Sequence, residues 1–87
     1  MNDTLIGSND KCNFYTNDWT KGAEKWAKEW GLKGIRCMVA EQKEDKARDY
    51  LLVEGNDIIY STTGYENLAV HIDIIALGKG LKREDSF

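Results

Sequence analysis

The segment from Gly64 to Gly78 is apolar on two sides of the helix that it is expected to form. One side is wide and suits packing on a sheet; it comprises Tyr65, Leu68, Ala69, Ile72, Ile75 and Ala76. A second stripe, made of Val70, Ile74 and Leu77, lies roughly opposite. A helix in a small domain needs one apolar face to dock on its sheet. The second stripe therefore requires a second covering surface.

A helix is favoured over a strand for this segment, although both patterns are present. Thr63 and Glu66 match a capping box, in which the two side chains satisfy backbone donors at a helix start. Gly78 suits the residue that follows a helix end. Residues 68–74 also alternate with period two and are rich in β-branched side chains, which is typical of a strand. The apolar segment, about ten residues long, favours the helix.

A second amphipathic helix is expected over residues 18–30. Asn17 and Asp18 offer capping side chains at its start, and Gly31 is placed to end it. One face carries apolar residues at helical spacing, namely Trp19, Ala23, Trp26 and Trp30. We interpret this tryptophan face as core. The alternative is that one end residue, Trp19 or Trp30, is an exposed interface anchor.

Three strands are expected between the two helices. Residues 34–41 alternate between an apolar face and a mixed face, as a half-buried strand does. Tyr50–Val53 and Ile58–Ser61 flank Gly55 and Asn56, and a Gly-Asn pair favours a two-residue hairpin. The predicted fold class is a single small α+β domain, helix–three-stranded antiparallel sheet–helix (αβββα).

The predicted domain occupies residues 17–80. Residues 1–16 are mostly polar and are expected to form a loosely ordered arm, and residues 81–87 a polar tail. The sequence has neither a secretory signal pattern nor an apolar run long enough to span a membrane. We therefore expect a cytoplasmic protein without a membrane partner.

The charged residues restrict the class of partner. The net charge is −3, from 12 basic and 15 acidic residues. A domain that binds phosphate backbones usually has a basic patch, so nucleic acid is not expected as the main partner. The alternative is a nucleic-acid-binding regulator that uses Lys21, Lys25 and Lys28, on the helix side opposite the tryptophans, together with Arg36.

The chain contains no evident catalytic, metal or cofactor motif. His71 and Asp73 invite a catalytic interpretation, but residues two apart on a helix point about 200° away from each other. We interpret both as part of a solvated polar strip between the two apolar faces of the helix. Cys12 and Cys37 lack zinc-ligand spacing and are expected to be free thiols, with a disulfide between them as the alternative. An enzyme built on His71 or Cys37 is the least favoured function.

The second stripe leads to the functional hypothesis. Fully burying an aliphatic side chain is worth about 1.5–3 kcal/mol, so a large stabilisation is lost if Val70, Ile74 and Leu77 remain exposed. The N-terminal arm, a second copy of the chain in a homodimer, or a foreign protein could cover them. We expect a non-enzymatic protein-interaction domain with no cofactor. Its partner-binding residues would be Val70, Ile74, Leu77, His71 and Asp73.

Small domains without catalytic motifs are common among accessory proteins of phages and mobile elements. Some of these proteins bind and block host defence systems, as anti-CRISPR proteins do. The size of this chain and its composition suit such an inhibitor, which would act by occupying the surface of another macromolecule. This expectation rests on analogy of size and class.

Overall fold

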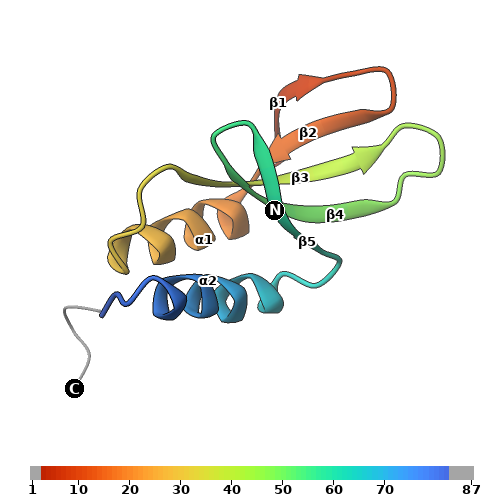
Figure 1. Cartoon of the computed structure of the whole chain (residues 1–87). Helices are drawn as coiled ribbons and strands as arrows, with labels where there is room; N and C mark the ends of the chain where they lie inside the picture. Colours follow the sequence, from red (N-terminus) through yellow and green to blue (C-terminus); the bar gives the residue numbers. More distant parts are fainter. Residues whose placement is uncertain (1–2, 83–87) are drawn as a thin grey trace.

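A computed structural model describes residues 3–82 of the chain. In this range the chain forms an α+β domain with two helices and one five-stranded antiparallel sheet (Figure 1). The strands follow chain order across the sheet, from β1 to β5. The elements are β1 (Thr4–Ser8), β2 (Cys12–Thr16), α1 (Asp18–Glu29), β3 (Ile35–Gln42), β4 (Arg48–Glu54), β5 (Asp57–Thr62) and α2 (Glu66–Gly78).

The predicted class, a small α+β domain, is confirmed, but the predicted order αβββα is wrong. The order over residues 3–82 is ββαβββα, because β1 and β2 form in the segment expected to be a loosely ordered arm. Their turn is built by Asn9, whose Oδ1 atom accepts hydrogen bonds from the backbone N–H groups of Lys11 and Cys12 at 2.9 and 2.8 Å. β2 then pairs along β3, a contact between distant segments that local periodicity does not reveal.

Helix α1 matches its prediction closely. Asn17 is the N-cap, and its Oδ1 atom accepts a hydrogen bond from the backbone N–H of Thr20 at 3.0 Å. The Thr20 hydroxyl accepts in return from the Asn17 N–H at 2.9 Å, which completes a capping box. Gly31 follows the helix with φ of +86°, where a residue without Cβ is favoured.

Residues 66–78 form helix α2, which confirms a helix rather than a fourth strand. The predicted capping box is wrong, because the N-cap position is Tyr65 and no side chain caps the helix there. The helix also continues through Gly78. The left-handed glycine is Gly80, at φ of +77°, and the Leu81 N–H beyond it donates to the Ala76 carbonyl at 3.0 Å. Most of the predicted polar tail, residues 83–87, lies outside the described residues.

Both helices cover the same face of the sheet (Figure 1). The predicted β4–β5 hairpin is confirmed, with Gly55 at φ of +63° in its turn. The core lies between the helices and the central strands, and its buried residues are Ala23, Ala27, Leu32, Ile35, Cys37, Leu52, Leu68, Ile72 and Ala76. Neither helix in residues 3–82 is long and apolar enough to cross a membrane.

Candidate functional site

The tryptophan face of α1 is turned toward α2. The Nε1–H groups of Trp26 and Trp30 both donate to one oxygen of Asp73, Oδ1, at 2.7 Å each. Both indole rings also pack against the core. Asp73 is therefore an internal acceptor between the helices, and its interpretation as part of a solvated polar strip is wrong.

His71 also contacts the rest of the domain. Its ring stacks on Tyr60 of β5, with ring centroids 3.8 Å apart and planes at 8°. Asp73 faces α1 while His71 faces β5, as expected for residues two apart on a helix. The structure therefore places these two candidate partner-binding residues in contacts within the domain rather than together at one site.

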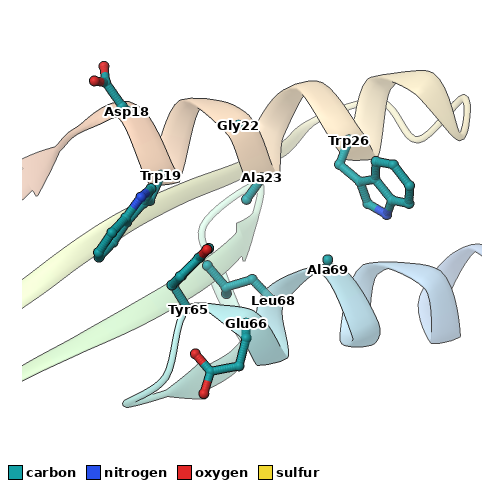
Figure 2. Close-up of a pocket in the computed structure, with 9 residues that line it drawn as sticks. All are labelled: Asp18, Trp19, Gly22, Ala23, Trp26, Tyr65, Glu66, Leu68 and Ala69. Atoms are coloured by element: carbon teal, nitrogen blue, oxygen red, sulfur yellow. The ribbon is translucent and has the colours of Figure 1, made fainter.

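A cleft of about 240 Å³ lies between the first halves of the two helices (Figure 2). Small residues on facing helices leave this space, with Gly22 and Ala23 on α1 and Ala69 on α2. The full lining is Asp18, Trp19, Gly22, Ala23, Trp26, Tyr65, Glu66, Leu68 and Ala69. Because Ala23 and Leu68 are buried while Gly22 and Ala69 are exposed, the cleft runs from the protein surface to the core.

An aromatic stack forms one wall of the cleft. The rings of Trp19 and Tyr65 lie 4.4 Å apart at 11°, and the Tyr50 ring packs at 6.4 Å from each of them. The core interpretation of the tryptophan face is thus correct for Trp26 and Trp30, which are partly buried against the core. Trp19, at 42% exposure, is the exposed end residue.

The second apolar stripe of α2 is exposed to solvent. Val70 and Ile74 are each 57% exposed, and Leu77 is 63% exposed. The charged residues of α2 do not interrupt this side, since Glu66 lies in the first turn and Asp73 faces α1. The N-terminal segment was one of the three candidates to cover this stripe. It instead forms β1 and β2, and β1 is the edge strand opposite β5.

The candidate nucleic-acid residues lie on other surfaces. Lys21, Lys25 and Lys28 are exposed on α1, on the side away from α2. Arg36 lies on β3, and its Nη2 atom donates to the Gly55 carbonyl at 3.2 Å. The helical lysines and Arg36 therefore belong to different layers of the domain.

The two cysteines lie on adjacent strands, β2 and β3, and are far apart along the strand direction. Cys37 is buried in the core, whereas Cys12 pairs in the sheet with Gln42, five residues further along the strand. That separation is about 16 Å at 3.3 Å per residue, far beyond disulfide geometry. Both cysteines are free, so the alternative of a disulfide is wrong. Burial, followed by the nearby Glu24 carboxylate, raises the pKa of Cys37 to about 12.

No protein family, curated protein or solved structure was found to match this chain. The surface formed by the cleft and the neighbouring stripe of Val70, Ile74 and Leu77 is the candidate functional site. Sequence reasoning found the stripe but missed the cleft. The sequence does contain small residues on both helices. They indicate a cleft only once it is known that α1 and α2 pack side by side.

Proposed function

We propose that this chain is a non-enzymatic protein-interaction domain that binds another protein and blocks or adapts it. The exposed stripe of Val70, Ile74 and Leu77 carries the proposal. These residues sit on a helix whose other side is already docked in the core through Leu68, Ile72 and Ala76. An apolar helix surface of this kind supplies the central contacts of many protein–protein interfaces.

The candidate reactive groups support binding over catalysis. Cys37 is buried and its pKa is raised to about 12, so its nucleophilic thiolate is disfavoured at neutral pH. The His71 ring is stacked on Tyr60, and Asp73 accepts two indole hydrogen bonds. These contacts support structural roles for His71 and Asp73 in the proposed binding domain.

A foreign protein is favoured over a second copy of the chain. An obligate homodimer usually buries about 1,000 Å² or more on each partner, whereas a standard specific interface buries about 800 Å². Helix α2 is about 20 Å long and carries three strongly exposed apolar residues, which suits the smaller interface. Glu66 lies one helical turn before Val70 on α2, Asp18 contributes to the lining of the cleft, and each copy carries a net charge of −3. These charges favour a partner of opposite sign over self-association.

Affinity capture with matched variants tests this function. The tagged wild-type chain, Ile74→Glu and Ile58→Glu would be used as baits in a lysate of the organism that encodes the protein. Ile58 is the matched control because it is 62% exposed but lies on β5, with its side chain on the sheet face away from the helices. We expect a stoichiometric partner that is retained by Ile58→Glu and lost with Ile74→Glu, since a closed apolar interface strongly disfavours an unpaired charge. Equal capture by Ile74→Glu would contradict the proposal.

Inhibition of a host defence system is the specific form of this function that we propose. Its support is the small size of the chain together with an apolar surface suited to occupying another protein. Expression of the chain in cells with active CRISPR interference would measure the survival of a targeted plasmid. We expect wild type and Ile58→Glu to raise survival, and Ile74→Glu to leave it unchanged. No effect of the wild-type chain would exclude inhibition of the tested system.

A further inference from the structure

The cleft between α1 and α2 has the size and chemistry of a site for one apolar side chain. Sites for drug-sized ligands usually measure about 300–1,000 Å³, and this cleft measures about 240 Å³. Its base is formed by Ala23 and Leu68, and the Trp19–Tyr65 stack forms one wall. The indole N–H of Trp26 donates to Asp73. The part of Trp26 that lines the cleft is therefore the apolar surface of its ring.

Two acidic residues contribute to the edge of the cleft, and their carboxylates point outward. Asp18 projects from the start of α1 away from α2, and Glu66 projects from the start of α2 away from α1 (Figure 2). Acidic residues in the first turn also stabilise the positive end of a helix. Here they have a second consequence, because both lie at the edge of the same apolar cleft. The exposed lysines of α1 lie on the side away from α2.

We propose that the cleft receives a large apolar side chain from a basic peptide segment of the partner protein. The anchor side chain packs between Trp19 and Trp26, and flanking lysine or arginine residues lie beside Asp18 and Glu66. Charge complementarity selects this occupant, since the edge carboxylates and the net charge of −3 both favour a cationic segment. The inference rests on the proposed protein-binding function and specifies the chemistry of the partner.

Selection from a displayed library of random 12-residue peptides, with the wild-type chain as bait, tests this chemistry directly. We expect enriched peptides to carry a large aliphatic or aromatic residue with lysine or arginine nearby. Their affinities, measured by fluorescence anisotropy, should weaken as salt increases. The double variant Asp18→Asn, Glu66→Gln should bind them at least threefold more weakly and with a smaller salt dependence.

Gly22 provides a matched pair of cleft variants. Within the described structure, a Cβ built on Gly22 meets no atom within 4 Å, so the position accepts a side chain. Gly22→Leu places bulk at the cleft, whereas Gly22→Ala adds one methyl group, and both residues favour helix. We expect Gly22→Leu to weaken the selected peptides at least tenfold and Gly22→Ala to remain within threefold of wild type. Ala69→Leu fills the cleft from α2 and is used if Gly22→Leu does not fold.

Several outcomes would overturn the inference. One is that the wild-type bait enriches no more peptides than the Gly22→Leu bait does. A second is that the enriched peptides are acidic or uncharged. A third is that the peptides bind wild type and a folded cleft-filling variant with equal affinity. The Ile74→Glu variant separates this inference from the proposed function. Peptides held in the cleft should bind Ile74→Glu within threefold of wild type, while capture of the whole partner by that variant fails. If no peptide binds the cleft, but the wild-type chain captures a partner that Ile74→Glu loses, the cleft inference is overturned and the proposed protein-binding function is retained.

Discussion

The indole Nε1 of Trp30 lies 2.7 Å from Oδ1 of Asp73, in a hydrogen bond that joins residues 43 positions apart. Trp26 donates to the same oxygen at the same distance. One carboxylate on α2 therefore holds two successive turns of the tryptophan face of α1. Because the cleft lies between these same helices, this contact helps to set the spacing on which its shape depends.

Replacing Asp73 should destabilise the domain, and more so when the new side chain cannot accept hydrogen bonds. Asp73→Leu leaves two partly buried indole N–H groups without this partner, and we expect a loss of about 2–3 kcal/mol in the free energy of unfolding. Asp73→Asn retains an amide oxygen as acceptor and should lose about 1 kcal/mol. Urea denaturation monitored by tryptophan fluorescence measures both values. Equal stability of Asp73→Leu and wild type would show that the bonds contribute nothing.

Gly22 inside α1 and Gly31 just beyond its end should respond oppositely to alanine. Gly22 lies inside the helix, and a Cβ there meets no described atom within 4 Å, so Gly22→Ala should stabilise the domain by about 0.5–1 kcal/mol. Gly31 has φ of +86°, and Gly31→Ala should destabilise it by about 1–2 kcal/mol. Thermal unfolding of both variants tests the pair. A loss of stability in Gly22→Ala would contradict the assigned helical environment.

The stripe residue Ile74 should matter for association and little for folding. Ile74→Glu exposes a charge where the side chain is already 57% exposed, so we expect a loss of less than about 2 kcal/mol on thermal or urea unfolding. At tens of micromolar, sedimentation should give a monomer of 9.9 kDa for wild type and variant. A wild-type dimer that Ile74→Glu dissociates would assign the stripe to a second copy, and an unfolded variant would assign it to the core.

Alkaline pH should weaken the fold through Cys37. The pKa of this thiol is raised from 9.0 to about 12, by burial first and then by Glu24. Between these values the unfolded state binds fewer protons than the folded state. The contribution of Cys37 to the free energy of unfolding is therefore complete below pH 9. Above pH 9 it decreases by about 1.4 kcal/mol per pH unit. Urea unfolding between about pH 8 and about pH 10.5 should show a steeper loss for wild type than for Cys37→Ala. Parallel curves would contradict the prediction.

Nucleic acid should bind weakly or not at all. The lysine side of α1 is exposed, but Arg36 lies on the sheet, and acidic residues outnumber basic ones in the chain. We expect no binding to DNA or RNA tighter than about 10 µM at about 150 mM salt. Fluorescence anisotropy with duplex and single-stranded probes measures this limit. Sub-micromolar binding that Lys25→Ala weakens would instead support the nucleic-acid-binding alternative.

The sequence by itself determined the features that depend on neighbours a few residues apart. The helical period of Trp19, Trp26 and Trp30 predicts α1, and Asn17 and Gly31 mark its ends through local hydrogen bonding and backbone conformation. The Gly55 turn likewise defines the β4–β5 hairpin. The stripe on α2 was visible because the helical period alone separates its two apolar sides.

Only the tertiary structure decided which of these surfaces meet. β1 and β2 carry a weak local signal and belong to the sheet because β2 pairs with β3, more than twenty residues away. Asp73 has the local pattern of a surface carboxylate, and it becomes an internal acceptor only because α2 packs beside the tryptophans of α1. The cleft arises in the same way, from small residues that are brought together across the helix pair. Such contacts depend on the relative placement of distant elements, which no local period specifies.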